Sequence, residues 1–220
     1  MAPIDNQNKP ALRLVCLSDL HDAQQTVSVP DGDVLIVAGD ICLEGRLAEV
    51  KRFDDWLGTL PHRCKLVIAG NHDWPFEIVG KGAAINLLKN AIYLEDAGIE
   101  INGVNFWGSP WQPEFCDWAF NLPRGPRLAE IWDGIPSNTD VLITHTPPYG
   151  ILDEVFGEHV GCEALAVAVQ RVRPKFHVFG HIHECHGVLK QGETTYVNAS
   201  LHDERFCLRH QPIVLDLQDP

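Results

Sequence analysis

Five short apolar runs, each ended by a polar or glycine-containing turn, are the feature that most constrains the fold. The runs are rich in β-branched residues, and apolar and polar positions alternate little within them. Such runs are typical of strands buried on both faces, because helices that cover both sides of a sheet leave no wetted face. The five predicted strands are Leu12–Leu17, Val34–Ala38, Lys65–Ala69, Val141–Thr144 and His177–Phe179.

Helical periodicity between several of these runs indicates strand–helix–strand units and therefore a largely parallel sheet. Glu44–Leu57 carries apolar residues at three- and four-residue steps, Glu77–Leu88 is interrupted by two glycines, and Gly161–Val172 is rich in alanine. Further runs without helices between them indicate a second, more mixed sheet: Val104–Trp107, Gly187–Lys190, Thr194–Val197 and Ile213–Leu217. We predict an α/β fold, a four-layer α/β/β/α sandwich of two mixed sheets with outer helices.

The acidic balance of the chain excludes several classes of protein. Seventeen Lys and Arg residues against thirty Asp and Glu residues give a formal net charge of −13 over 220 residues. A chain this acidic is a poor candidate for binding a nucleic-acid polymer or an anionic membrane surface. Its length and its 45% hydrophobic residues suit one domain with a substantial core. We expect a loose arm over residues 1–10 and a single domain over residues 11–220.

The cysteines and the first residues are typical of a cytoplasmic protein. The seven cysteines are odd in number and scattered, which favours reduced thiols. Residues 1–10 lack the basic-then-apolar order of a secretory signal. No apolar run approaches the roughly 18 residues that span a bilayer. We therefore expect a cytoplasmic location without membrane contact.

Polar donors follow every one of the five buried strands. The segments that follow them, in chain order, are Ser18–His21, Gly39–Asp40, Gly70–Asp73, His145 and Gly180–His183. Because the carboxyl ends of parallel strands line the ligand crevice of an α/β sheet, we expect these segments to meet at one edge. Each segment alone has an ordinary explanation as a turn or a hydrogen-bonded histidine. Together the five segments predict a metal site.

The candidate metal ligands offer imidazole, carboxylate and amide groups, and no cysteine is among them. The candidates are Asp19, His21, Asp40, Asn71, His145, His181 and His183. This set suits Mn²⁺, with Fe or Zn²⁺ as alternatives, and argues against a closed structural zinc site. Seven ligands exceed the needs of one ion and would serve two if Asp40 bridges them. Two cations about 3.5–4 Å apart would reverse the local negative charge and clamp the attacking and leaving oxygens of a displacement at phosphorus.

These motifs resemble, in the same order, those of the calcineurin-like metallophosphoesterases. Within that superfamily the chain is most similar to the metallophosphoesterase domain-containing proteins, which are similar to class III cyclic-nucleotide phosphodiesterases. The likeness extends from about Leu12 to Leu217. Gly108-Ser109-Pro110-Trp111 and Asn121-Leu122-Pro123-Arg124-Gly125 carry the narrower resemblance.

The resemblance implies two sets of four ligands that share Asp40. One ion would be held by Asp19, His21, Asp40 and His183, and the other by Asp40, Asn71, His145 and His181. A hydroxide that bridges the ions would attack phosphorus in line. His72 would bind no metal and would donate a proton to the departing alkoxide, because imidazole titrates in the right range.

Three acidic residues are candidates for supporting the site. Asp22 and Asp73 each follow a site histidine, and each is either a hydrogen-bond partner of the site or an ordinary surface aspartate. Many relatives carry an acid three residues after the bridging aspartate, where this chain has Leu43. The group that orients His72 is therefore open, with Glu44 and Asp73 as candidates.

The aromatic segment 106–126 has two interpretations. It is either a self-packed loop or a lid or wall that stacks a base or an aromatic leaving group. Trp111 and Arg124 in this segment, together with Asn198, are candidate substrate contacts.

The sequence thus predicts a metal-dependent phosphodiesterase that hydrolyses small phosphodiesters, with cyclic nucleotides among the candidates. A phosphomonoesterase on the same two ions is the nearest alternative. A non-catalytic scaffold of the same fold is a third interpretation, and it is disfavoured because all seven ligand positions are filled.

Overall fold

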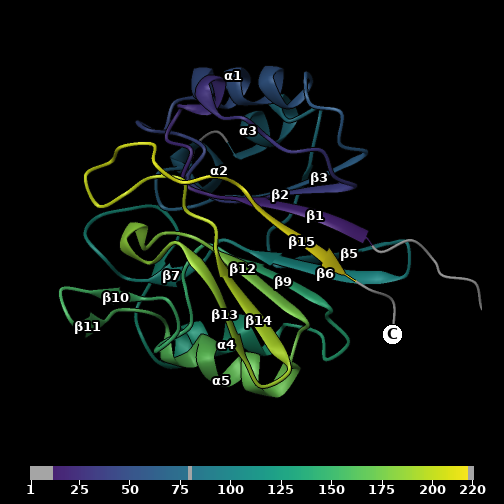
Figure 1. Ribbon diagram of the computed structural model, residues 1–220. Coiled ribbons are helices and arrows are strands. Elements are labelled where there is room, and N and C mark those ends of the chain that lie inside the picture. Colours follow the sequence, from purple (N-terminus) through teal and green to yellow (C-terminus); the bar gives the residue numbers. More distant parts are fainter. Residues whose placement is uncertain (1–11, 79–80, 218–220) are drawn as a thin grey trace, which may run out of the picture.

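A computed structural model describes residues 12–78 and 81–217, and the expected arm over residues 1–10 lies outside these residues. Two mixed sheets pack face to face between two layers of helices (Figure 1). This arrangement confirms the predicted four-layer sandwich. In the part of the chain described, no helix combines the length and apolar character needed to cross a membrane.

The first sheet contains most of the amino-terminal half. Its strands, in spatial order, are β15 (Ile213–Leu217), β1 (Leu12–Leu17), β2 (Val34–Ala38), β3 (Cys64–Ile68) and β4 (Ile92–Tyr93). Strands β1 to β4 are parallel, whereas β15 pairs antiparallel with β1. Its outer face is covered by α1 (Leu47–Leu57), α2 (Trp74–Glu77) and α3 (Lys81–Leu87). The single helix expected over residues 77–88 is thus divided into α2 and α3.

The second sheet contains two strands that the sequence placed with the first. Its order is β13 (Gly187–Gln191), β14 (Thr194–Asn198), β12 (Phe176–Phe179), β9 (Val141–Thr144), β6 (Val104–Ser109) and β5 (Ala97–Ile101). Strands β9 and β12 belong here because β6 pairs with β9 and β14 pairs with β12, all parallel. The helices α4 (Pro126–Asp133) and α5 (Glu163–Val172) cover the outer face of this sheet.

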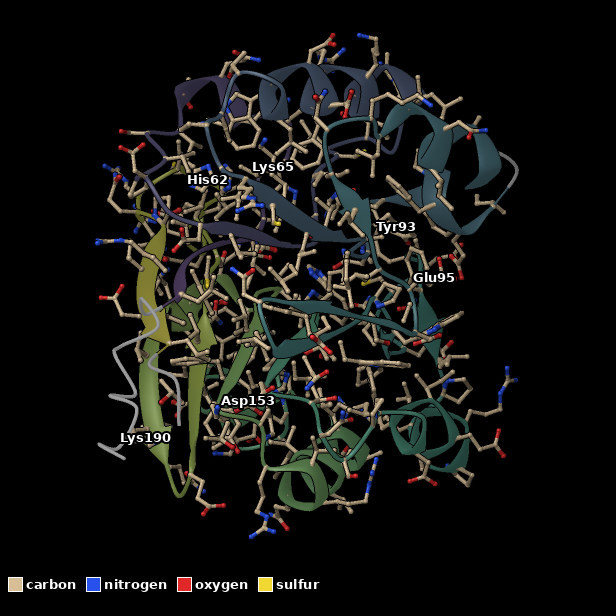
Figure 2. All side chains as sticks on the ribbon, turned by 90° about the vertical axis from the view of Figure 1, so that its right-hand side faces the viewer. His62, Lys65, Tyr93, Glu95, Asp153 and Lys190 are labelled. Atoms are coloured by element: carbon tan, nitrogen blue, oxygen red, sulfur yellow. The ribbon has the colours of Figure 1, made fainter. Side chains whose placement is uncertain are left out.

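Alternate residues of a buried strand pack into different cores, one on each face of the sheet. Both faces of the strand are therefore apolar. Val15 and Leu17 of β1 pack toward the α1–α3 layer, while Leu14 and Cys16 pack toward the second sheet. In the second sheet, Leu142 packs on α4 and α5. Figure 2 shows side chains filling the spaces between the layers.

The two sheets join where their parallel strands end. Ser18 after β1 forms a parallel bridge to Ser200 after β14. The Ser18 N–H donates to the Ala199 carbonyl at 2.9 Å, and the Ser18 carbonyl accepts from Leu201 at 3.1 Å. This connection brings the loops after β1, β2 and β3 against the loops after β9 and β12.

Short elements complete the described chain. They are η1 (Gln24–Thr26), η2 (His183–Cys185), β7 (Gln112–Pro113), β8 (Asn121–Leu122), β10 (Glu154–Val155) and β11 (Glu158–His159). Asp153 holds the β10–β11 hairpin through bonds from the Gly150 and Gly161 N–H groups, each 2.9 Å, and lies 2.7 Å from His159 Nδ1.

Candidate active site

Four of the candidate ligands have a left-handed backbone. The φ angles are 56° at Asp19, 43° at His21, 53° at Asp40 and 69° at His181. Residues with a side chain rarely adopt this region, although Asp and His do so more often than most. Strained backbone of this kind is concentrated at functional sites, where the surrounding structure holds it in place.

Glycines beside the ligands allow the loops to approach one another closely. A Cβ on Gly180 would collide with the Asp19 carboxylate and with Ser18, and a Cβ on Gly70 would collide with Asp40. Only glycine fits these positions without moving a ligand.

We expect Gly180→Ala to displace Asp19 and weaken metal binding by at least about tenfold, the scale of losses seen when groups that orient ligands are removed. Titration against a competing chelator measures the affinity, and circular dichroism checks that the variant folds. Gly82→Ala is the matched control, because a Cβ at Gly82 meets no atom within 4 Å. Equal affinities for the two variants would contradict the expected crowding.

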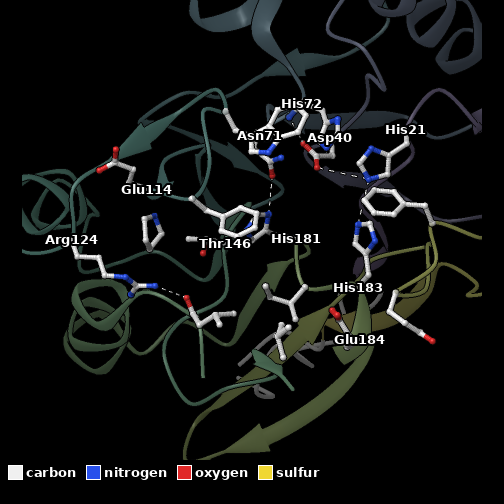
Figure 3. Close-up of a pocket in the computed structure, with 18 residues that line it drawn as sticks. His21, Asp40, Asn71, His72, Glu114, Arg124, Thr146, His181, His183 and Glu184 are labelled. Atoms are coloured by element: carbon white, nitrogen blue, oxygen red, sulfur yellow. Dashed lines mark hydrogen bonds and ion pairs between the residues drawn. The ribbon is translucent and has the colours of Figure 1, made fainter. Parts of the chain in front are cut away.

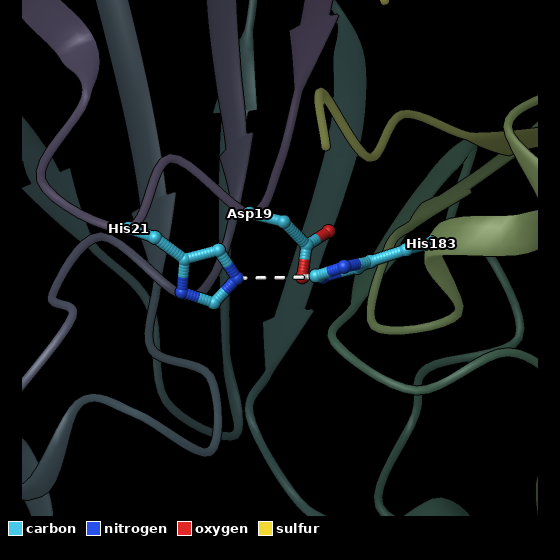
Figure 4. A group of neighbouring side chains, drawn as sticks. All are labelled: Asp19, His21 and His183. Carbon is cyan, nitrogen blue, oxygen red and sulfur yellow. Dashed lines mark hydrogen bonds and ion pairs between the residues drawn. The ribbon is translucent and has the colours of Figure 1, made fainter. Parts of the chain in front are cut away.

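One group of donors gathers around Asp19. His183 Nε2 lies 3.4 Å from Asp19 Oδ1 and 3.3 Å from His21 Nε2. His21 Nε2 lies 3.9 Å from Asp40 Oδ2. Figure 4 shows the His21 ring turned toward Asp19 and His183. Two imidazole nitrogens that face each other beside a carboxylate form an arrangement that suits a shared cation.

A second group gathers around Asn71. Its Oδ1 lies 2.9 Å from His145 Nε2 and 2.8 Å from His181 Nδ1. His145 Nε2 lies 3.4 Å from Asp40 Oδ2, so Asp40 contacts both groups. Figure 3 shows Asn71 facing His181, and Asp40 placed between Asn71 and His21. The structure therefore brings all seven predicted ligands together in the two groups that the resemblance implied.

Two of the histidines are oriented by carbonyl groups behind them. His145 Nδ1 is 2.9 Å from the Ala38 carbonyl, and His183 Nδ1 is 3.2 Å from the Asp203 carbonyl. A carbonyl only accepts, so each Nδ1 carries a proton and each Nε2 faces the site. A metal ion at Nε2 would take the place of any proton there, and the residues present fit divalent metal ions.

The carboxylates of the site are held in their charged form. Burial opposes ionisation, but the neighbouring histidines outweigh it and hold the pKa values of Asp19 and Asp40 well below their usual range. Burial likewise lowers the pKa of His21 to about 4 and that of His181 to about 3. For His145 the Asp40 carboxylate outweighs burial and raises the pKa to about 9. This buried concentration of ionised carboxylates attracts cations.

His72 lies beside the ligands with one ring nitrogen already engaged. His72 Nδ1 lies 2.8 Å from the Leu43 carbonyl, and the ring stacks on Trp118 with centroids 4.2 Å apart. Donor atoms of His72, His21 and Asp40 lie within 4.8 Å of one another. The group that orients His72 is therefore the backbone of Leu43, and the expectation of Glu44 or Asp73 is wrong for this contact.

Asp73 is buried and organises the loops that carry the ligands. Its carboxylate accepts from the N–H groups of Gly70 at 2.7 Å, Cys42 at 2.8 Å and Ile41 at 3.3 Å. These bonds tie the loop after β2, which carries Asp40, to the loop after β3, which carries Asn71. Asp73 is thus a hydrogen-bond partner that supports the site and not an ordinary surface aspartate.

We expect Asp73→Ala to destabilise the metal-free protein by about 3 kcal/mol or more, because three backbone donors lose their buried partner. Denaturant unfolding monitored by circular dichroism measures the change. Asp55→Ala is the control, because Asp55 is exposed and pairs only with Lys51 among the described residues. A variant at Asp73 as stable as this control would show that the carboxylate does not hold the loops.

The other two acidic candidates, Asp22 and Glu44, form ion pairs with arginines. Asp22 pairs with Arg52 at 2.5 Å and accepts from Gln24. Glu44 is exposed and pairs with Arg46. Neither carboxylate hydrogen-bonds to a candidate ligand among the described residues, which favours the interpretation of Asp22 as an ordinary aspartate and leaves the supporting role of Glu44 without a contact.

A cavity of about 440 Å³ opens over the two ligand groups. Besides five of the candidate ligands and His72, its lining residues are Pro113, Glu114, Phe115, Trp118, Arg124, Thr146, Val155, Val160, Ile182, Glu184, Glu204 and Phe206. The segment 106–126 therefore contributes both to the cavity lining and to the core, while its stacking of a base or an aromatic leaving group stays a prediction. Pro113, Glu114, Phe115 and Trp118 form a wall of the cavity. Phe120 packs into the core between the first sheet and its covering helices.

Of the three predicted substrate contacts, only Arg124 lines the cavity. Trp111 donates its indole N–H to Asp96 at 2.8 Å, and Asn198 donates to the Ile182 carbonyl at 2.8 Å. Neither residue lines the cavity, so no contact in the structure supports their predicted role as substrate contacts. Asn198 instead supports the loop that carries His181 and His183.

Sequence reasoning missed Phe206. Its ring lies 4.8 Å from that of His183 and 5.5 Å from that of His21, and it covers one side of the ligands. No local motif marks Phe206, which reaches the site on a loop that follows β14. The aromatic density of residues 106–126 was a usable signal for Phe115 and Trp118.

Comparison with known proteins identifies the family to which the chain belongs. The model of the calcineurin-like phosphoesterase family matches residues 12–185, and the chain belongs to that family of metal-dependent phosphoester hydrolases. It is 46% identical to metallophosphoesterase domain-containing protein 1 of Homo sapiens over 233 residues, which covers 94% of this chain and 72% of that protein. It is 42% identical to a UPF0046 protein of Caenorhabditis elegans over 218 residues, covering 93% and 75%.

Solved structures share the fold at low sequence identity. The protein TT1561 of Thermus thermophilus superposes with a TM-score of 0.55 at 13% identity, and the match covers 86% of this chain and 88% of that chain. The family and the clustered His and Asp residues together indicate divalent metal binding.

Proposed function

We propose that the protein hydrolyses small phosphodiesters with two bound divalent metal ions, Mn²⁺ foremost. The observation that carries this proposal is the position of His72 beside Asp40, which contacts both ligand groups. The ions would supply Lewis acidity and activate water near neutral pH. They would be held by the two sets of ligands that share Asp40.

The residues of the chain then account for the remaining requirements of the reaction. The new bond joins the oxygen of water to phosphorus, the bond from phosphorus to the leaving oxygen breaks, and the leaving oxygen takes up a proton. His72 Nδ1 is held by the Leu43 carbonyl, so the other ring nitrogen is oriented to donate that proton. Asp40 Oδ1 fixes this loop by accepting from the His72 backbone N–H at 2.8 Å.

The charge of the cavity favours a diester over a monoester. A monoester brings a further negative charge, and the only Lys or Arg side chain among the described residues that line the cavity, Arg124, is already paired with Glu163 at 2.6 Å. Cyclic nucleotides and aryl diesters are candidate substrates, with Phe115 and Trp118 as apolar surfaces for a ring.

The proposal is tested with metal-stripped protein reloaded with Mn²⁺, Fe²⁺ or Zn²⁺. We expect a higher kcat/KM for bis-p-nitrophenyl phosphate than for p-nitrophenyl phosphate, which shares its leaving group. A clear preference for the monoester would overturn the choice of diester. No turnover of either compound with any of the ions would favour the non-catalytic scaffold.

A further inference from the structure

The cavity carries more negative charge than the metal ligands require. The carboxylates that line it in addition to the ligands belong to Glu114, Glu184 and Glu204. Within residues 12–78 and 81–217, Arg124 is the only lysine or arginine that lines the cavity. Its guanidinium is engaged, because it pairs with Glu163 and donates to two backbone carbonyls at 2.7 Å. The lining therefore offers no uncommitted cation to a second anionic group.

The carboxylates lie at both ends of the cavity. Figure 3 shows Glu184 on the His183 side of the cavity and Glu114 on the opposite side, where Arg124 also lies. No residue that the structure describes forms an ion pair with Glu184. Glu204 lies 3.6 Å from Arg205, but both side chains are more than half exposed, so this pair offsets little of its charge. The lining thus carries carboxylates whose charge is little offset by neighbouring cations.

Two exposed aromatic residues line the same cavity and are close in the chain to two of these glutamates. Phe206 is two residues from Glu204 on the same loop, and 57% of its surface is exposed beside the His183 ring. Phe115 follows Glu114 directly and is 58% exposed. Aromatic faces combined with carboxylates are the surroundings that bind ammonium groups. A second phosphate beside these carboxylates would meet like charge.

We propose that this cavity selects phosphodiesters by the charge of the ester arm, with Glu184 and Glu204 as the specificity-determining residues. An arm with an ammonium group is favoured, a neutral arm is accepted, and an arm with a further phosphate is rejected. This inference rests on the proposed function and names the substrate class of the same site.

Three diesters with the same leaving group test this order in the Mn²⁺-loaded protein. They are p-nitrophenyl phosphorylcholine, thymidine 5′-(p-nitrophenyl phosphate) and the 3′-phosphate of the latter. We expect kcat/KM to fall in that order. The double variant Glu184→Gln with Glu204→Gln should lower the ratio for the cationic over the phosphorylated substrate by roughly tenfold, because two weak ionic contacts are lost.

The matched control is Glu100→Gln with Glu130→Gln. It removes the same two charges from exposed positions outside the cavity, so it separates the local effect from the net charge of the protein. We expect its ratio to equal that of the unmodified protein. An equal fall of the ratio in both double variants would overturn the assignment of Glu184 and Glu204.

Calorimetric binding gives a readout that needs no turnover. Phosphorylcholine and methyl phosphate share the phosphate group, and we expect the unmodified protein to bind phosphorylcholine more tightly, with the difference reduced in the Glu184/Glu204 variant. Equal Kd values, or turnover of all three diesters without the expected order, would overturn this inference and leave the proposed function standing. Absence of turnover with the binding preference retained would instead contradict the proposed function.

Discussion

Asp40→Ala is expected to abolish hydrolysis of bis-p-nitrophenyl phosphate and to lower the metal content below two ions per chain. Its carboxylate contacts ligands of both groups, with Oδ2 3.4 Å from His145 and 3.9 Å from His21. Loss of a shared ligand therefore weakens both sites at once. We expect kcat/KM to fall by about 10³-fold or more, which corresponds to about 4 kcal/mol of transition-state stabilisation.

Metal content by plasma mass spectrometry, measured beside kcat/KM, checks this result. Asp22→Ala is the control, because Asp22 pairs with Arg52 outside the ligand groups. It should keep both ions and most of the activity. If Asp40→Ala retained two ions per chain, Asp40 would not be the shared ligand.

His72→Ala is expected to keep both metal ions and to slow diesters according to their leaving groups. A p-nitrophenolate departs without help, whereas an alkoxide needs the proton that His72 supplies. We expect the alkyl diesters to slow by about 10²- to 10⁴-fold, the usual contribution of a general acid, and the p-nitrophenyl diesters to slow much less. The measurement is kcat/KM over a series of diesters with leaving groups of graded pKa.

A suitable control is His186→Ala, because His186 stacks on His210 outside the cavity and binds the Ser200 carbonyl. This variant should show the same dependence on the leaving group as the unmodified protein. An equal loss for good and poor leaving groups in His72→Ala would remove the general acid from the mechanism. Loss of metal in that variant would make His72 a ligand.

The buried strands were predictable because their sequences change abruptly at both ends. The strands β1, β2, β9 and β15 have the predicted bounds, since an apolar run gives way directly to a polar turn in each case. The third strand ends one residue earlier than predicted, because Ala69 is buried beside Gly70 without pairing as a strand. The sheet to which a buried strand belongs could not be predicted, because apolar content is the same in either sheet.

The ligands were predictable for a related reason. They follow strands directly, so the position of the strand end fixes the position of the side chain. Contacts that depend on the backbone, such as the Leu43 carbonyl at His72, leave no mark in the residue type. Trp111 and Asn198 were misjudged because an indole or an amide near a site serves the core as readily as a substrate. Phe206 is distant in the chain from every ligand motif.

The most direct test of the account is anomalous diffraction from crystals grown with Mn²⁺ and measured on either side of the manganese edge. We expect two peaks, one among Asp19, His21 and His183 and one among Asn71, His145 and His181, with Asp40 touching both. A single peak, or ordered histidines that hydrogen-bond one another with no peak between them, would contradict the central claim.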